Sequence, residues 1–277
     1  MIVKSNISTN FENYSIILLR KFMDKKILKK FGFKHDQQGI INRYIRESGG
    51  WEKHLKNTKE FIIQSAQLKD KKSCTILGSG WLLDVPLDKL SQLFDKVQLV
   101  DIVHPKQIIH KIKKFENVEL IETDITGLMD PVYHFMKKAK KSNLTLDQIE
   151  ATHIDLWFQD IKNTDFVVSV NILNQLDILI CDYIKKFEIY SEQEIKEFRK
   201  IIQQNHLDFL PKGKSCLITD FEEVNLDGSN EVIQTKKLIH INLPLSKHKK
   251  KWQWNFDMNQ TYHKDYNTIF KVVGMEI

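Results

Sequence analysis

One segment, residues 73–101, constrains the fold more than any other part of this sequence. Its parts are, in order, an apolar run, a glycine turn, a helix-like stretch, a second apolar run and an acid: Cys74–Leu77, Gly78-Ser79-Gly80, Leu82–Phe94, Val97–Val100 and Asp101. This order predicts the nucleotide-binding half of a doubly wound α/β domain. Glycines let a ligand approach the backbone where a Cβ would collide, and a carboxylate at the next strand tip can accept hydrogen bonds from both ribose hydroxyls.

The alternation of strands and helices continues beyond Asp101, as expected of a mainly parallel sheet. Further strands are predicted at Val118–Glu122, Phe166–Val170 and Ser215–Thr219. Helices are predicted at Pro105–Lys113, Asp130–Lys141 and Leu146–Ile149, with one longer segment at Asn174–Leu210. The last strands follow one another without helices, as is typical of an antiparallel sheet edge: Val232–Leu243, Trp252–Phe256 and Phe270–Met275.

The first 70 residues differ from the rest, because they are lysine-rich and helical in pattern and contain no strand signal. We therefore expect an N-terminal helical cap, residues 1–70, and a Rossmann-like domain, residues 71–277. The predicted fold class is α/β: a doubly wound, mostly parallel sheet with an antiparallel C-terminal edge and an N-terminal helical cap.

Composition narrows the classes of protein. The formal charge of +6 permits an anionic partner without requiring one. Cys74, Cys181 and Cys216 lie in apolar surroundings without ligand-like spacing, so we expect reduced, buried thiols, a cytoplasmic location and no metal site. No apolar run approaches roughly 18 residues, and Ser15–Leu19 is too short for a signal-peptide core, so neither a membrane span nor a secretion signal is expected.

The glycine turn departs from the dinucleotide fingerprint at one position. Leu83 stands where a third glycine would allow close packing beside a pyrophosphate-binding helix. This departure argues against NAD or FAD and favours a nucleoside ligand without a pyrophosphate. An NAD(P)-dependent oxidoreductase stays open as an alternative.

Four stretches resemble successive motifs of the class I S-adenosylmethionine-dependent methyltransferases: LGSGWLLDVP, VQLVD, NVELIETDI and DFVVSVNILNQL. The resemblance covers roughly residues 70–277, with its early motifs the most specific. It implies that S-adenosylmethionine is the cofactor and that its methyl group is transferred directly. The cofactor-binding residues that it implies are Gly78, Ser79 and Gly80 at the methionine end, Asp101 at the ribose, Asp124 at the adenine amino group and Asn171 facing cofactor and substrate, together with Ile102 and Ile125.

The polar residues of these motifs also have structural interpretations. Asp101 could cap the following helix, Asp124 could begin a turn, and Asn171 or Asn174 could cap a helix. Asp84 could support the glycine turn or interact favourably with a helix dipole. These alternatives stay open at the level of sequence.

A polar and aromatic cluster surrounds the Gly49-Gly50 break and supplies candidate cap or substrate residues: Tyr44, Arg46, Trp51 and His54. A helical cap over the carboxyl ends of the strands would bring them to the ligand, where Arg46 could pair with the cofactor carboxylate. The alternative is a lysine-rich helical region with one aromatic anchor. Asp220 and Glu222, after the fifth predicted strand, could meet a substrate or lie in a solvated loop.

The sequence identifies neither the methyl acceptor nor a catalytic residue. No NPPY or DPPY tetrapeptide follows the fourth predicted strand, so the branches that methylate base amino groups or glutamine lose support. A small-molecule acceptor is favoured. Nucleic acid is the less favoured acceptor: Lys247–Lys251, beside Trp252 and Trp254, could bind phosphates and stack on bases, or form a solvated hairpin tip. A non-catalytic nucleoside-binding or scaffold module of the same fold is the remaining alternative.

Overall fold

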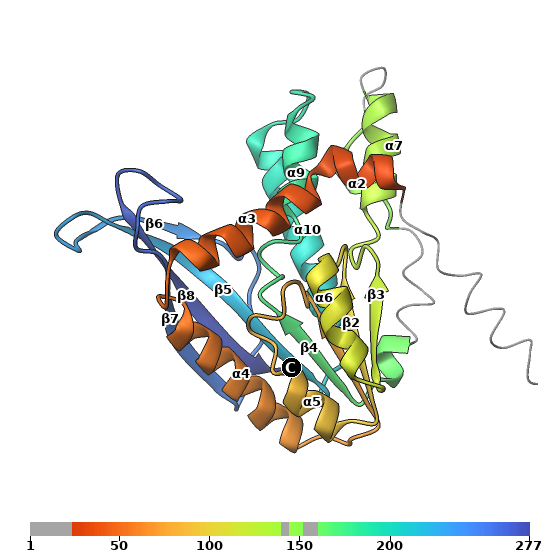
Figure 1. Ribbon diagram of the computed structural model, residues 1–277. Helices are drawn as coiled ribbons and strands as arrows, with labels where there is room; N and C mark the ends of the chain where they lie inside the picture. The colour runs from red at the N-terminus through yellow and green to blue at the C-terminus, as the bar shows by residue number, and fades with distance from the viewer. Residues whose placement is uncertain (1–23, 140–143, 152–159) are drawn as a thin grey trace, which may run out of the picture.

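The computed structural model describes residues 24–139, 144–151 and 160–277, and within them the strands form one eight-stranded sheet (Figure 1). The strand order is β3-β2-β1-β4-β5-β8-β7, and β6 pairs with the far half of β5. The strands are β1 Ser73–Leu77, β2 Lys96–Asp101, β3 Val118–Glu122, β4 Phe166–Val170, β5 Ser215–Leu226, β6 Val232–Lys237, β7 Lys249–Asp257 and β8 Asn267–Glu276.

The pairing directions confirm the predicted fold class. Strands β1 to β5 are parallel and follow the 3-2-1-4-5 order of a doubly wound domain. Next to β5, the strand β8 is antiparallel, and β7 is antiparallel to β8. This antiparallel edge is the one predicted from the last strands of the sequence, which follow one another without helices.

Helices cover both faces of the sheet. They are α2 Lys25–Phe31, α3 Phe33–Arg46, α4 Glu52–Gln67, α5 Leu87–Leu93, α6 Lys106–Lys111, α7 Met129–Ala139, α9 Ile178–Lys185 and α10 Glu192–Phe209, with 3-10 turns at Ile112–Lys114 and Leu146–Gln148. Helices α4, α5 and α6 pack on the face that carries Cys74 and Ile76, while α10 packs on the face that carries Leu77. Successive strand residues point to opposite faces, which explains why the apolar runs in the sequence are nearly continuous.

Two predicted helices begin or end elsewhere in the structure. The helix predicted from Leu82 begins at Leu87, because Leu82 has a positive φ of 55° and Pro86 precedes the first turn. The segment Asn174–Leu210 is two helices. Glu188 has φ 56°, and Ser191 starts α10 with a capping box to Glu194.

The fifth strand is longer than predicted, since it runs past Thr219 to Leu226. It gains pairing from β6 on one side and β8 on the other. Strand β6 ends at Lys237, short of the predicted Leu243. The part of the predicted helix Asp130–Lys141 beyond Ala139, and the helical pattern of residues 1–23, lie outside the described residues.

The N-terminal helices have different positions. Helix α4 lies against the antiparallel edge, where Phe61 packs on Gly274 and the Trp51 indole donates to the Phe256 carbonyl at 2.9 Å. Helix α3 crosses above the ends of the parallel strands (Figure 1). The division of the chain at residue 70 stays a prediction, and α4 contributes to the same apolar core as the sheet.

The structure places all three cysteines as free, buried thiols, as predicted from their apolar surroundings in the sequence. Burial raises the pKa of Cys216 to about 12, so this thiol stays protonated. Within the part of the chain that the structure describes, no helix combines the length and the apolar character that crossing a bilayer requires.

The contact between α4 and β8 generates a first prediction. A Cβ at Gly274 would lie 2.9–3.1 Å from three ring atoms of the buried Phe61, so Gly274→Ala should lower the free energy of unfolding by about 1–3 kcal/mol. Gly228→Ala is the matched control, because a Cβ there meets nothing within 4 Å. Urea unfolding of both variants measures the difference. Equal stabilities would contradict the close approach of α4 to the sheet.

Candidate functional site

A cavity of about 370 Å³ lies where the parallel strands end, beneath α3. Its walls come from the glycine turn after β1, the segments after β2, β3 and β4, the inner faces of β5, β7 and β8, and helices α3 and α4. Open α/β sheets bind ligands outside the carboxyl ends of their strands, at the point where the strand order reverses. Here that point lies between β1 and β4.

The glycine turn is shaped by what surrounds it. Gly78 has φ 83°, and a Cβ there would lie 2.1 Å from Ile172 Cγ2 and 2.8 Å from the Val170 carbonyl oxygen. The amides of Gly78 and Ser79 both donate to the Val100 carbonyl, at 2.9 and 3.2 Å. The turn is therefore closed against the end of β2 and the segment after β4, and only glycine fits at its first position.

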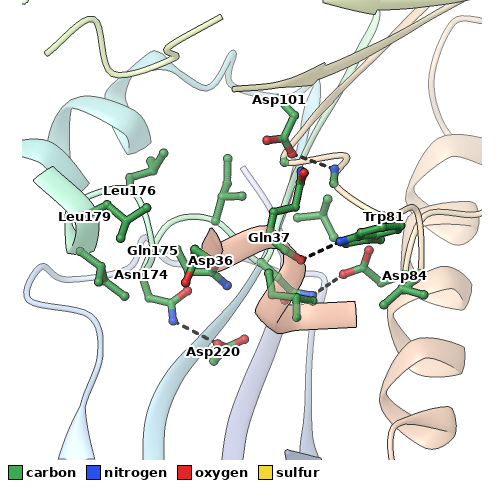
Figure 2. A pocket seen from close by; sticks show the side chains of 18 of the residues that line it. Asp36, Gln37, Trp81, Asp84, Asp101, Asn174, Gln175, Leu176, Leu179 and Asp220 are labelled. Carbon is green, nitrogen blue, oxygen red and sulfur yellow. Dashed lines mark hydrogen bonds between the residues drawn. The ribbon is translucent and has the colours of Figure 1, made fainter. Parts of the chain in front are cut away.

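Asp101 faces the cavity from the tip of β2 (Figure 2). Its Oδ2 accepts from the Gly80 amide at 2.7 Å, and its Oδ1 accepts from the Ile102 amide at 2.8 Å. Burial raises the pKa of this carboxyl to about 6, against the opposing effect of the backbone N–H groups. Asp101 does not cap the next helix, because α6 begins at Lys106 with Pro105 at its N-cap. Ile102 also lines the cavity.

Asp124 and Ile125 line the cavity after β3, but the Asp124 carboxylate forms a turn. Oδ1 accepts from the Thr126 amide at 2.9 Å and from its hydroxyl at 2.6 Å, and Oδ2 accepts from the Met129 amide at 2.8 Å. Asp124 thus begins a turn, which is one of the two roles that the sequence left open for it. A contact of Asp124 with an adenine amino group stays a prediction.

Asn171 follows β4 in a left-handed conformation with φ 52°. Its Nδ2 donates to Asp84 Oδ2 at 2.6 Å and lies 3.4 Å from His54 Nε2. Neither Asn171 nor Asn174 caps the following helix, because Asp177 stands at the N-cap of α9. Asp84 therefore supports the site through Asn171 and does not lie in a helix.

The four cap candidates separate in the structure. Trp51 and His54 line the cavity, whereas Tyr44 and Arg46 do not. Arg46 is exposed and its Nε donates to the Asn42 carbonyl at 3.2 Å within its own helix. It therefore does not line the cavity, contrary to the expectation for a residue that would pair with a cofactor carboxylate. Arg43, one turn earlier on α3, lines the cavity instead, with its guanidinium 4.7 Å from the ring centre of Phe256.

His54 is neutral. Its Nδ1 accepts from the Trp252 indole at 3.1 Å, and its ring stacks on Trp254 with centres 4.0 Å apart. Burial lowers its pKa to about 3. An imidazole in this setting fills the wall of the cavity, and it does not take up a second ring proton near neutral pH.

Helix α3 closes the cavity with residues that the sequence reasoning missed. Gln37 donates from Nε2 to the Val103 carbonyl at 2.7 Å, and its own carbonyl accepts from the Trp81 indole at 2.8 Å (Figure 2). Asp36, the residue before Gln37 on α3, also lines the cavity. No signal in the sequence marked them, because polar residues are expected on any solvated helix face.

Asp220 lies on the inner face of β5 and is 1% exposed, so it is not part of a solvated loop. A β-bulge at Phe221 separates Asp220 from Glu222. Asp220 pairs with Val272 and Glu222 pairs with the adjacent Lys271, so the two acids lie on opposite faces of the sheet. Glu222 forms an ion pair with Lys271 away from the cavity. Burial, together with the negative charge of Asp84, raises the pKa of Asp220 to about 7.

The basic segment near β7 does not have the geometry that nucleic-acid stacking needs. Trp252 and Trp254 are 8% and 7% exposed and face the core, so neither presents a ring to an outer surface. The lysines Lys249–Lys251 are exposed at the start of the strand. The stacking part of the nucleic-acid interpretation is therefore wrong.

Comparison with solved structures finds methyltransferases. The chain is similar to the 1,6-didemethyltoxoflavin N1-methyltransferase of Burkholderia thailandensis (8% identity, TM-score 0.40, covering 99% of this chain and 94% of that one). It is also similar to the N-methyltransferase NodS of Bradyrhizobium japonicum WM9 (11% identity, TM-score 0.34, covering 83% and 99%). For coclaurine N-methyltransferase the values are 13% identity and a TM-score of 0.31, and the match covers 62% of this chain and 35% of that one.

No family model matches the sequence, and a search of curated proteins also finds no match. The fold therefore rests on the strand order and pairing directions. That fold is a doubly wound, mostly parallel α/β sheet with an antiparallel edge.

The glycine turn generates a second prediction. Gly78→Ala and Gly213→Ala both force alanine into a positive φ, 83° and 76°, which costs about 1–2 kcal/mol in each. At Gly213 a Cβ meets nothing within 4 Å, whereas at Gly78 it collides with Ile172 and the Val170 carbonyl. Gly78→Ala should therefore be less stable than Gly213→Ala by about a further 1–3 kcal/mol in urea unfolding. Equal losses would show that the turn is not tightly enclosed.

Proposed function

We propose that this protein is an S-adenosylmethionine-dependent methyltransferase that acts on a small molecule. The observation that carries the proposal is the pairing of Asp101 with the Gly80 amide at the end of the cavity. This pairing joins the acid after β2 to the glycine turn after β1, the two elements that the methyltransferase resemblance assigns to the ribose and the methionine end of the cofactor.

The residues present fit a nucleoside cofactor without a pyrophosphate. The Gly78 position has no room for a Cβ, and the half-buried Asp101 presents its carboxylate to the cavity. A dinucleotide would require a helix N-terminus directly after the glycine turn. Here α5 begins only at Leu87, and the Leu83 side chain lines the cavity at the place of the third glycine. These features favour S-adenosylmethionine over NAD(P).

The chain contributes alignment and exclusion of water to such a reaction. When bound, S-adenosylmethionine supplies a methyl group on a sulfonium, whose positive charge makes the thioether a good leaving group. In-line displacement then depends mainly on holding the nucleophile in line in a dry site. The hydrogen bonds that Gln37 donates to the Val103 carbonyl and accepts from the Trp81 indole hold α3 across the cavity, so this helix is the element that excludes solvent.

A small acceptor suits the size and walls of the site. The cavity of about 370 Å³ is near the lower end of the roughly 300–1,000 Å³ usual for small-molecule sites, and the cofactor occupies part of it. The buried tryptophans of β7 remove the main argument for a nucleic-acid acceptor. A non-catalytic nucleoside-binding module of the same fold is separated from an enzyme by the experiments below.

Titration of the full chain with S-adenosylmethionine and S-adenosylhomocysteine tests the cofactor. We expect binding on the order of micromolar, and Asp101→Ala should weaken it about tenfold or more, since a charge-assisted pair of hydrogen bonds to the ribose is lost. The matched control is Asp95→Ala, which removes an exposed carboxylate just before the other end of β2. Thermal unfolding confirms that both variants fold.

Three outcomes would contradict the proposal. The folded wild-type chain could bind neither compound, Asp101→Ala could bind as tightly as Asp95→Ala, or NADH could raise the Tm where S-adenosylmethionine does not. Methyl transfer by a chain that binds the cofactor separates an enzyme from a non-catalytic module.

A further inference from the structure

Several buried polar atoms in the wall of the cavity have no hydrogen-bond partner. Three of them are acceptor oxygens: Asn171 Oδ1, Asn174 Oδ1 and Asp220 Oδ1. Their side chains are 8%, 7% and 1% exposed. The other two in the described part of the wall are donors, Arg43 Nε and Trp254 Nε1. Since buried polar groups are normally paired, the three unpaired acceptors on residues that line one cavity indicate a ligand that also donates hydrogen bonds.

Asp220 and Asn174 form one unit at the end of the cavity opposite Asp101 (Figure 2). Asn174 Nδ2 donates to Asp220 Oδ2 at 3.0 Å, which fixes the carboxylate and leaves Oδ1 free. Asp101, in contrast, is engaged at the glycine turn. The two carboxylates therefore belong to different halves of the cavity, and the methyltransferase resemblance assigns no cofactor contact to Asp220.

The charge of the cavity wall favours a cationic ligand. Among the described residues of the wall, six side chains are carboxylic acids: Asp36, Asp84, Asp101, Asp124, Asp220 and Glu223. The cationic side chains among them are Arg43 and Lys236. Arg43 lies against the rings of Phe256 and Tyr262 and is not paired with Asp220. This excess of acids lowers the free energy of a bound cation.

The next inward row of the sheet after Asp220 carries aromatic rings, which suit an organic cation: Glu223 pairs with Phe270, and Phe270 pairs with Trp254. Trp254 and Phe270 line the cavity with ring centres 5.6 Å apart, and Trp254 stacks on His54. Residues that pair across neighbouring strands lie on the same face of the sheet. Asp220 and Trp252 both pair with Val272, and Trp254 pairs with Phe270, two residues before Val272 on β8. Asp220 and these rings therefore face the same side. Aromatic faces attract ammonium groups and bury the apolar body that carries them.

A metal ion is the other cation that acids could attract. Within the described residues, no group of three or more His, Cys, Asp and Glu side chains is placed to hold one. The acids of the cavity wall come from separate elements, and Asp101 and Asp124 are already engaged by backbone amides. An organic ammonium group therefore fits the site better than a metal.

We propose that the methyl acceptor is an amine on a small apolar body, bound between Asp220 and the aromatic wall, and that Asp220 Oδ1 takes the proton that its nitrogen must lose. This inference rests on the proposed function and names its substrate class.

The proton step has a physical basis in burial. An ammonium ion has no lone pair, so it must be deprotonated before it can act as a nucleophile. Burial disfavours the charged form of both groups: it lowers the pKa of the ammonium, and in the cavity without a ligand it raises the pKa of Asp220 to about 7, so burial favours transfer of the proton to the carboxylate. The ammonium passes one proton to Asp220 Oδ1. The neutral nitrogen then forms a bond to the methyl carbon while the carbon–sulfur bond breaks and its electron pair stays on sulfur, leaving a methylated ammonium, a thioether and a neutral Asp220.

The test uses a panel of arylalkyl and alkyl amines, beginning with phenethylamine and hexylamine, each compared with the alcohol of the same carbon skeleton. Binding to the full chain in the presence of saturating S-adenosylhomocysteine is measured by calorimetry and by Tm shift, and methyl transfer is measured with radiolabelled S-adenosylmethionine. We expect amines to bind, and to be methylated, in preference to their alcohols. Asp220→Asn should weaken amine binding about tenfold or more, because a charged hydrogen bond is lost, and should leave the affinity for S-adenosylhomocysteine within about twofold.

Glu222→Gln is the matched control, since Glu222 lies on the same strand, faces away from the cavity and should leave amine binding unchanged. If S-adenosylhomocysteine binds but the panel shows no preference for amines, or if Asp220→Asn weakens S-adenosylhomocysteine as much as the amine, the amine inference fails and the methyltransferase proposal stands. If the folded wild-type chain does not bind S-adenosylhomocysteine at all, the proposed function fails, and the methyl-transfer step with it.

Discussion

The hydrogen bond from the Gly80 amide to Asp101 is the interaction on which the site depends. It joins the ends of two neighbouring parallel strands, and the Val100 carbonyl strengthens the same junction by accepting from Gly78 and Ser79. An ionised acceptor makes this bond stronger than an ordinary backbone hydrogen bond. The turn therefore keeps its open, left-handed shape without a ligand, and a ligand that enters it does not have to order the backbone.

The acids of the cavity are costly to bury. Burial raises the pKa of Asp84, Asp101, Asp124 and Asp220 above the ordinary range of a carboxyl group. Backbone and amide N–H groups offset this cost for the first three, whereas Asp220 has one amide donor and one free oxygen. Such uncompensated burial is common at functional sites, where the missing partner is the ligand.

The fold and half of the site follow from local sequence patterns. The strand, turn and acid of residues 73–101 are close in the chain, so a local pattern is enough to predict that they contact one another. Strands β3 and β4 also have the predicted bounds. The contact of His54 with Asn171 spans 117 residues, and no local pattern reports it. Arg43 and Arg46 lie one turn apart on α3, and which of them faces the cavity depends on how the helix is rotated over the sheet. That rotation is set by tertiary contacts such as Gln37 with Val103.

The bulge at Phe221 has a consequence for how such a cavity can change over evolutionary time. Side chains alternate between the two faces along a strand. With Phe221 as the extra, unpaired residue, Asp220 and Glu223 face the cavity and Glu222 faces the other side of the sheet. Moving the surplus position beyond Glu223 would turn Glu222 inward and Glu223 outward without altering any amino-acid type in the strand, whereas deleting Phe221 would leave each acid on its present face. The place of the bulge along β5 is thus a means of changing ligand preference on an unchanged scaffold.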